Sequence, residues 1–274
     1  ADPTFLGYVC MGSPAGRQFV LERMSAAVTE IGAEWIKLDF NVDPDAGCTR
    51  TDHGHGAGDG LLRHYEGLYA VLDEFRQRHP DVVFEDCSSG GLRLDLGIAR
   101  HVHCIFLSDP DYTEHALQVL WGTSLMLPPA SILHWSWSQW RGDYPKAQLD
   151  FSGLTDDEFA TSLRAAMLHR FGVSLRLPEL RPSHLEVLRQ HVAIYTATLA
   201  DLVRDGQLLR LTPQPQRNGL GERAPALQLS HGDRHVVAQY VLPGGTTPAF
   251  VQPTLPPGEW AVSDLTTGAR IERA

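Results

Sequence analysis

The chain has 274 residues, enough for one large domain and a smaller one, and its 43% hydrophobic and 20% charged residues are typical of a folded globular protein. Its formal net charge of −10 argues against binding to nucleic acid or to an anionic membrane, because both depend on clustered Lys and Arg side chains. A neutral substrate fits this charge better. No apolar run approaches the ~20 residues that cross a bilayer and no secretory leader is recognisable, so we expect a cytoplasmic protein.

Strand-like and helix-like segments alternate over the first two thirds of the chain. Hydrophobic periodicity predicts helices at residues 17–32, 61–78, about 113–125, 156–170 and 184–204. Short apolar runs predict strands at residues 35–40, 82–86, 104–109 and 131–135, and a further strand that ends at 175–177.

The alternation of strands with long helices predicts an α/β fold with a parallel sheet. We expect a (β/α)8 TIM-type barrel that is incomplete in this chain, because about five strand–helix units do not close eight strands. The chain is therefore expected to be the C-terminal part of a larger polypeptide. A doubly wound open sheet is the alternative, although no GxGxxG follows any predicted strand.

The pattern changes near residue 206, where helical periodicity stops. Prolines and glycines then separate short alternating runs such as HVVAQYVL at 235–242 and GEWAVSDL at 258–265. These runs predict a small antiparallel β-sandwich. The expected domains are thus a catalytic barrel portion at 1–205 and a C-terminal β domain at 206–274.

The segment WIKLDFN carries the first candidate site residues. Alternate side chains of a strand face opposite sides. One face of this strand is apolar, and the other becomes more polar toward its C-terminal end, where it carries Lys37, Asp39 and Asn41. Barrel active sites lie at that end, so we expect Lys37 and Asp39 in the mouth of the barrel. The structural alternative is a buried ion pair between them.

Two further motifs follow predicted strands. EDCSSGGLRLDLG places small residues and the pair Gly90-Gly91 after Cys87, and such a turn lets backbone N–H groups approach a ligand. A plain turn between strand and helix needs the same residues. FLSDPDY places Asp109 at a strand tip, where capping of the next helix is the alternative role.

Asp39 and Asp109 lie on predicted strands two apart, and side chains of alternate strands share one layer of a barrel. With strands ~4.8 Å apart, inward-leaning carboxyls approach ~5–6 Å. Retaining glycosidases need about 5–5.5 Å between their carboxyls and inverting ones about 6.5–9.5 Å. The geometry favours a retaining glycosidase and leaves inversion open.

Three motifs in one order carry a family resemblance. KLDFN at 37–41, CSSGGLRLD at 87–95 and SDPDY at 108–112 resemble the motif series of glycoside hydrolase family 36. That family contains the melibiases, or α-galactosidases, and related α-N-acetylgalactosaminidases. The resemblance extends over roughly residues 5–265.

The resemblance implies that Asp39 is the nucleophile on the fourth barrel strand and Asp109 the general acid/base on the sixth. The substrate-binding residues that it implies are Lys37, Asn41, Cys87, Gly90, Gly91 and Trp137, with Trp135 as a second part of an aromatic wall. Ordinary packing at the barrel rim is the alternative for the two tryptophans. The expected reaction is cleavage of terminal α-linked galactose from a small α-galactoside or oligosaccharide, without a cofactor.

The chain departs from the family pattern at three points. Leu38 stands where tryptophan is common, and Asp111 lies one residue short of the family's second aspartate, so it is given no role. The family's N-terminal β domain and first barrel strands, with a paired-aspartate motif for the 4- and 6-hydroxyls of the sugar, are missing from this chain. An α-N-acetylgalactosaminidase and an inactive or sugar-binding fragment therefore remain alternatives. The oligomeric state stays open, a homo-oligomer included.

A metal-dependent barrel hydrolase is the more distant alternative. The chain has 13 histidines, and the HVH and HGH pairs resemble metal-ligand spacing. However, His53 and His55 fall in a polar loop, while His101 and His103 precede a strand at the end of a barrel that supports stability. We therefore expect packing or surface histidines and no metal. The four cysteines form no CxxC pair and are expected as free thiols.

Overall fold

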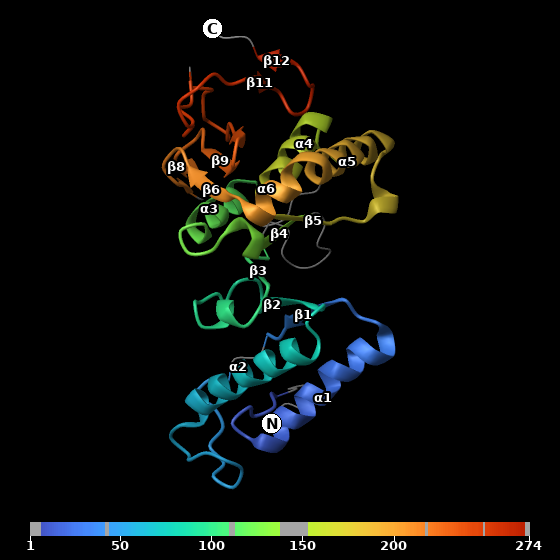
Figure 1. The fold of residues 1–274 in the computed structure, drawn as a ribbon, viewed down its shortest axis with the longest axis vertical. Helices are drawn as coiled ribbons and strands as arrows, with labels where there is room; N and C mark the ends of the chain where they lie inside the picture. Colours follow the sequence, from blue (N-terminus) through green and yellow to red (C-terminus); the bar gives the residue numbers. More distant parts are fainter. Residues whose placement is uncertain are drawn as a thin grey trace. The chain divides into compact units, whose positions relative to one another are not determined.

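The computed structural model describes residues 7–41, 44–109, 113–137, 153–216, 219–248 and 250–271. The chain forms two compact units, residues 1–106 and 107–274 (Figure 1). The elements of the first unit, in chain order, are α1 (Pro14–Ile31), β1 (Trp35–Asp39), α2 (Gly60–Arg78), β2 (Val83–Cys87), the short 3-10 helix η1 (Ile98–Arg100) and β3 (Cys104–Phe106).

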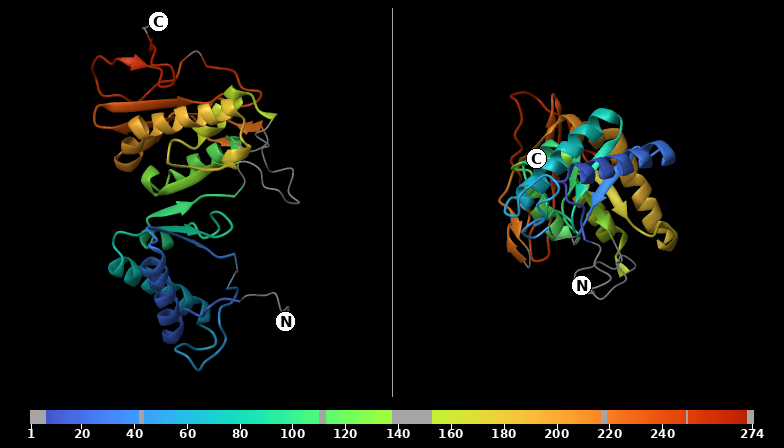
Figure 2. Two further views of the ribbon diagram at one scale, coloured as in Figure 1. Left: turned by 90° about the vertical axis from the view of Figure 1, so that its right-hand side faces the viewer. Right: turned by 90° about the horizontal axis from the view of Figure 1, so that it is seen from below.

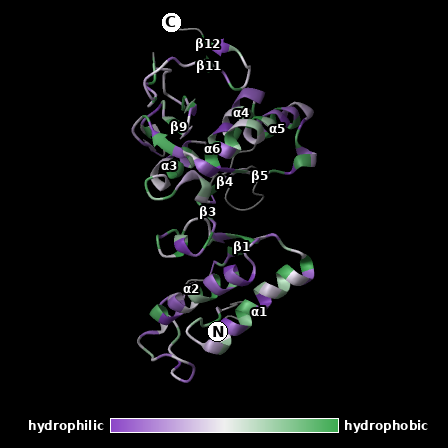
Figure 3. Ribbon diagram, in the orientation of Figure 1, coloured by the Kyte–Doolittle hydropathy of each residue, from purple (hydrophilic) through white to green (hydrophobic). Residues whose placement is uncertain are grey.

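Local signals explain the two long helices of the first unit, which pack against each other. Helix α1 begins where the Ser13 side chain accepts the Gly16 N–H at 3.3 Å, and it ends at Gly32, whose φ of 72° is left-handed. Helix α2 buries one face, and Figure 3 shows hydrophilic and hydrophobic residues interspersed along it. Its Gly67 lies so close to the Met11 backbone that an added Cβ would meet the Met11 carbonyl oxygen at 1.9 Å.

The strands of the first unit are parallel and ordered β1-β2-β3. The β1–β2 register runs from Trp35 opposite Val83 to Asp39 opposite Cys87, so these two residues end neighbouring strands at the same edge. Strand β3 is shorter than the predicted 104–109, and Asp109 therefore follows the strand by three positions. The largest fully buried side chains around these strands belong to Phe75, Phe84, Phe106, Ile98 and Ile105.

The second unit continues the alternation of helices and strands. Its elements to residue 205 are α3 (Thr113–Thr123), the 3-10 helix η2 (Pro129–Ser131), β4 (Ile132–Trp137), α4 (Asp156–Ala165), β5 (Arg170–Ser174), the 3-10 helix η4 (Leu177–Glu179), α5 (Pro182–Ile194), the π-helical turn η5 (Tyr195–Leu199) and α6 (Ala200–Asp205). Strands β4 and β5 are parallel. Phe159, Leu163 and Leu188 form a buried cluster between α4 and α5.

Two sequence predictions in this region were wrong in their bounds. The helix expected at 156–170 ends at Ala165, and the strand expected to end at 175–177 lies earlier, as β5. A strand that follows a helix after four residues without a Gly or Pro signal is read as part of the helix. The long closing helix at 184–204 is present, although a π-helical turn interrupts it.

Short antiparallel strands make up the rest of the chain. They are β6 (Gln207–Arg210), β7 (Pro215–Gln216), β8 (Leu220–Gly221), β9 (Ala226–His231), β10 (Arg234–Gln239), β11 (Val262–Ser263) and β12 (Arg270–Ile271). Three of them form a sheet in the order β10-β9-β6, and β7–β8 and β11–β12 are separate pairs. This part of the chain is coloured orange to red in Figure 2.

Side chains tie this antiparallel segment to α3 and the turn after it. The Trp121 indole N–H donates to the Thr212 carbonyl, the Gln214 amide donates to the Gln118 carbonyl, and the Arg210 guanidinium donates to the Ser124 carbonyl, each at 3.0 Å. The antiparallel segment is therefore held onto the helical part of the second unit.

Within the described ranges, no helix combines the length and the apolar character that a bilayer crossing requires.

Candidate active site

Strand β1 carries the first group of predicted site residues, and the buried carboxylate of Glu85 binds two of its side chains. Lys37 Nζ lies 3.1 Å from Glu85 Oε1, and the Trp35 indole N–H donates to Glu85 Oε2 at 2.8 Å. The Lys37 ammonium also lies 3.9 Å from the centre of the Phe106 ring, a cation–π contact. The ion pair that secures Lys37 thus runs to Glu85 on β2, whereas the sequence alternative had paired it with Asp39. The Asp39 side chain is exposed at the end of the strand.

Sequence reasoning missed Glu85, because only the register of the folded sheet places it beside Lys37. Lys37 and Glu85 are directly opposite in the parallel β1–β2 pair. The Glu85 residue is only 3% exposed, so its charge requires the compensation that Lys37 and Trp35 supply. Lys37, which lies two residues before Asp39 on the same strand, therefore has its ammonium group held in place by Glu85.

Asp86 is a second buried carboxyl that the sequence did not single out. It is 1% exposed, and its Oδ1 atom has no hydrogen-bond partner in the described part of the chain. Burial raises the pKa of Asp86 to about 7, with Arg93 opposing the shift and the neighbouring negative charges of Asp95, Glu85 and Asp39 adding to it. Asp86, one residue before the end of β2, is therefore a carboxyl group that is still partly protonated near neutral pH.

The predicted turn at residues 87–91 is present and contacts the end of β1. Ser89 has a φ of 44° and Gly90 a φ of 81°, so the chain reverses sharply after Cys87. The Ser89 N–H donates to Asn41 Oδ1 at 2.7 Å, and the Ser88 hydroxyl donates to the Phe40 carbonyl at 2.9 Å.

Arg93 strengthens the same junction. Its guanidinium donates to the Phe40 carbonyl at 2.7 Å and to the Ser88 hydroxyl, and it lies 3.7 Å from the centre of the Phe40 ring. Asn41 therefore helps to fix the turn, and its role toward a sugar stays a prediction, as do those of Cys87, Gly90 and Gly91.

Asp109 belongs to the second unit. The Leu107 N–H donates to the Leu133 carbonyl at 3.0 Å, so the chain is still bound to β4 two residues before Asp109. The Ser108 hydroxyl and His115 Nε2 are 3.0 Å apart. Residues 110–112, Asp111 among them, lie outside the described residues, so the helix-cap alternative for Asp109 is not tested.

The two tryptophans of the predicted aromatic wall lie on β4. Trp135 is opposite Gly172 of β5, and a Cβ at Gly172 would meet the Trp135 ring at 2.5 Å, so this glycine makes room for the indole. The side chain of Trp137 and residues 138–152 lie outside the described part of the structure. Since Asp39 belongs to the first unit and Asp109 to the second, the spacing of their carboxyls stays a prediction.

The histidines weighed as metal ligands divide into two groups. His101 binds the Asp73 carboxylate at 2.7 Å and stacks on Tyr69, while His103 Nδ1 accepts the Phe84 N–H at 2.9 Å. Both are packing residues. His53 and His55, in contrast, lie beside Cys10 and Cys48, so that four side chains capable of binding a metal come together in the first unit.

Comparison with known proteins gives a consistent result. The family model described as Melibiase matches residues 9–206. Over 199 residues the chain is 30% identical to alpha-galactosidase AgaA of Geobacillus stearothermophilus, covering 70% of this chain and 25% of that protein. Over 118 residues it is 30% identical to alpha-galactosidase Mel36A of Lactobacillus acidophilus, covering 43% of this chain and 16% of that protein.

Solved structures are similar in fold. The galactosidase domain of the alpha-galactosidase-sucrose kinase AgaSK matches with a TM-score of 0.74 and 17% identity, covering 96% of this chain and 34% of its own. The crystal structure of AgaA matches with a TM-score of 0.69 and 23% identity, covering 84% of this chain and 30% of its own. The predicted fold class, an incomplete (β/α)8 barrel followed by antiparallel strands, is confirmed, and the chain spans only a minor part of each relative.

Proposed function

Because the chain belongs to the melibiase family, we propose that it forms the catalytic part of a retaining α-galactosidase with Asp39 as nucleophile and Asp109 as general acid/base. The observation that carries the proposal is the edge formed by β1 and β2. There the exposed Asp39 ends its strand opposite Cys87, beside a turn that is tied to Phe40 and Asn41.

The proposed reaction has two steps. An Asp39 carboxylate oxygen attacks the anomeric carbon while Asp109 transfers its proton to the departing glycosidic oxygen, so that a covalent glycosyl-enzyme forms and the aglycone leaves. Asp109, now ionised, takes a proton from water, whose oxygen attacks the same carbon and releases Asp39. The sugar then retains its anomeric configuration.

Lys37 and the turn at residues 87–91 are proposed to bind the sugar. The contact with Glu85 fixes the Lys37 ammonium, so little side-chain entropy is lost when it donates to sugar hydroxyls. Trp137 is proposed as an apolar wall for the sugar ring, and residues 206–274 as a separate β domain beside the catalytic portion at 1–205.

An α-galactoside is the proposed substrate. Crystal structures of AgaA variants are described in complex with raffinose and with stachyose, and another with 1-deoxygalactonojirimycin. An α-N-acetylgalactosaminidase is the second candidate because the resemblance includes both activities. Hydrolysis rates of the aryl α-galactoside and of its 2-acetamido counterpart, measured side by side, distinguish the two.

The nucleophile is tested with Asp39→Asn and Asp39→Gly in the full chain. We expect Asp39→Asn to abolish turnover of an aryl α-galactoside, and azide to rescue Asp39→Gly with an inverted β-galactosyl azide as product. Asp81→Asn is the matched control, because Asp81 is an exposed aspartate before the start of β2, and it is expected to behave like wild type. Wild-type turnover in Asp39→Asn would overturn the assignment.

The retaining outcome has its own readout. Proton NMR of the first-formed sugar should show the α-anomer before mutarotation, whereas a β-anomer would mean inversion. If the wild-type chain binds galactose in calorimetry but hydrolyses neither substrate, the sugar-binding alternative is correct instead.

A further inference from the structure

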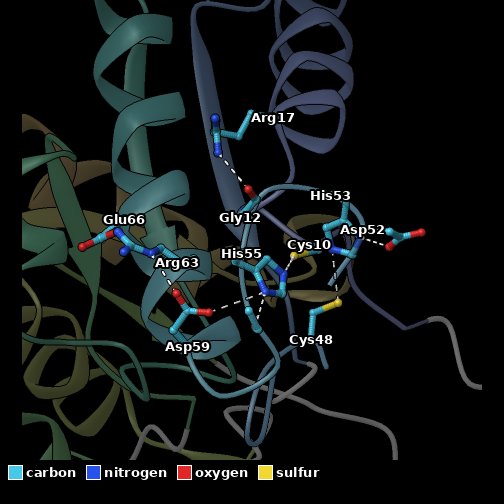
Figure 4. Close-up of polar contacts among 11 residues, drawn as sticks. Cys10, Gly12, Arg17, Cys48, Asp52, His53, His55, Asp59, Arg63 and Glu66 are labelled. Carbon is cyan, nitrogen blue, oxygen red and sulfur yellow. Dashed lines mark hydrogen bonds and ion pairs between the residues drawn. The ribbon is translucent and has the colours of Figure 1, made fainter. Parts of the chain in front are cut away.

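Four side chains converge in the first unit, and none of them is a proposed catalytic or sugar-binding residue. Cys10 Sγ lies 3.2 Å from His55 Nε2, and Cys48 Sγ lies 3.4 Å from His53 Nε2 (Figure 4). The four ligand atoms all lie within 4.8 Å of one another. Tetrahedral zinc with Zn–S bonds of about 2.3 Å and Zn–N bonds of about 2.0–2.1 Å separates its sulfur and nitrogen ligands by roughly 3.5 Å. The two observed sulfur–nitrogen distances are close to this value.

The outer ring nitrogens of both histidines are already bound, as they are in metal sites. His53 Nδ1 lies 3.0 Å from the Asp52 carboxylate, and His55 Nδ1 lies 2.7 Å from the Gly56 carbonyl, with the Asp59 carboxylate at 3.9 Å. Both acceptors require the proton on Nδ1, which leaves the lone pair on Nε2 directed at the thiols. A carboxylate or carbonyl partner of this kind fixes the ring and raises its basicity in metal sites.

The backbone is also shaped for the convergence. Gly54 has a φ of 110°, a conformation that L side chains rarely adopt, and it lets His53 and His55 turn toward the same point. The two rings meet edge to face with centroids 4.8 Å apart. The N–H groups of Gly12 and Ser13 lie within hydrogen-bond reach of the Cys10 sulfur, which holds this side chain in place.

We propose that Cys10, Cys48, His53 and His55 bind one Zn²⁺ in a closed, structural site that joins the segment before α1 to the loop after β1. Two thiolates and two imidazoles are the ligand set of structural zinc, and softer ligands select against Mg²⁺ and Ca²⁺. Four protein ligands leave no open position, so the ion is structural and takes no part in the proposed hydrolysis. This proposal replaces the sequence expectation that the chain holds no metal.

The position of the site gives the ion its role. The loop at residues 44–59 follows the strand that ends in Asp39 and leads into α2, and it contains no helix or strand of its own. His55 is buried, and Cys10, Cys48 and His53 are partly buried. Cys10 precedes α1, whereas the other three ligands follow β1. The ion therefore links the segment before α1 to the loop after β1 and holds this long loop in one conformation.

The first test is elemental analysis of the purified chain, with zinc supplied during expression. We expect close to one zinc per chain in the wild type and in Cys104→Ala, a control at a buried cysteine of β3 outside the cluster. Cys48→Ser should lose the metal. X-ray absorption at the zinc edge should show two sulfur and two nitrogen neighbours. These readouts do not involve glycosidase activity, so they stand or fall separately from the proposed function.

A second variant keeps the test decisive if Cys48→Ser fails to fold. Asp52 binds His53 from the outside and is largely exposed, so Asp52→Asn should fold like the wild type. We expect it to weaken zinc binding by about 10–100-fold, measured by competition with a chromogenic chelator. Asp81→Asn should leave the affinity unchanged. The proposal would be overturned if zinc-free protein failed to bind added Zn²⁺. It would also be overturned if mass spectrometry found a disulfide between Cys10 and Cys48 in protein kept in reducing buffer.

Discussion

At the scale of single residues, Glu85 is the group on which the arrangement of β1 depends. It is buried, and its two carboxylate oxygens bind Lys37 and the Trp35 indole. Removing one partner of a buried ion pair leaves the other charge poorly compensated. The position of the Lys37 ammonium therefore rests on a residue that does not itself reach the strand end.

Glu85→Gln tests this dependence. We expect the free energy of unfolding to fall by roughly 1–3 kcal/mol, less than for a fully buried pair because Lys37 is partly exposed. The Lys37→Met/Glu85→Gln double variant should be less destabilised than the sum of the single variants, measured by urea denaturation. Strict additivity would show that the two side chains do not interact.

Asp86 gives a prediction about pH. Below about pH 4 this carboxyl is protonated in both states. Between about pH 4 and 7 the unfolded chain ionises it while the fold retains its proton, since the folded pKa is raised to about 7. Stability is therefore lost as the pH rises through this window and levels off above it. At 1.4 kcal/mol per pKa unit the total is on the order of 4 kcal/mol.

Asp86→Asn should remove this penalty. Relative to wild type, the variant is expected to gain about 2–3 kcal/mol between pH 5 and pH 8, measured by urea denaturation at both values. Asp81→Asn, at an exposed site, should follow the wild-type trend. A wild-type pH dependence in Asp86→Asn would show that the buried carboxyl is ionised throughout.

At the scale of elements, two glycines in helices should respond oppositely to alanine. At Gly67 in α2 an added Cβ would meet the Met11 carbonyl oxygen at 1.9 Å, a contact that only a backbone shift relieves. At Gly122 in α3 the nearest atom is the end of the flexible Gln214 side chain at 3.4 Å. Alanine favours a helix by about 1 kcal/mol over glycine where space permits.

We therefore expect Gly67→Ala to destabilise the chain by about 1–3 kcal/mol and Gly122→Ala to stabilise it by up to about 1 kcal/mol. Thermal unfolding of the two variants beside wild type measures both. Equal effects would mean that α2 does not approach Met11 as closely as described.

The sequence predicted most elements because their signals are local. Alternation and apolar runs located β1, β2 and β4, and periodicity located α1 and α2. The bounds of β5 were predicted too late because no Gly or Pro signal separates α4 from Arg170, the first residue of the strand. Pairings between distant segments carry no local signal, which is why Glu85 was not recognised as the partner of Lys37.

The metal-ligand cluster shows the same limit. The spacing of His53 and His55 was visible, but Cys10 lies on the far side of α1 and β1 in the chain. Only the fold shows that these residues meet. The functional motifs were recognised as a family pattern, whereas the spacing of Asp39 and Asp109 could be inferred only from general barrel geometry.

At the scale of the whole molecule, the chain consists of two compact units, and the proposed zinc site belongs entirely to the first. Chelation should therefore act on one unit. Hydrogen exchange followed by mass spectrometry should show faster exchange at residues 7–60 after zinc removal, and unchanged exchange in the cluster of Phe159, Leu163 and Leu188. Uniform acceleration over both units would contradict a local structural role.

The contact between α3 and the antiparallel segment also bears on how the sequence can change over time. Trp121 and Gln214 donate to backbone carbonyls, and Arg210 donates both to the Ser124 carbonyl and to the Ser124 hydroxyl. A backbone carbonyl is present whatever residue occupies its position, so the contacts of Trp121 and Gln214 depend on the donor side chain alone. Substitutions at Thr212 or Gln118 leave these backbone acceptors in place, whereas a substitution at Ser124 also removes the hydroxyl that Arg210 contacts. Related chains can therefore dock these two segments alike with different residues at the acceptor positions.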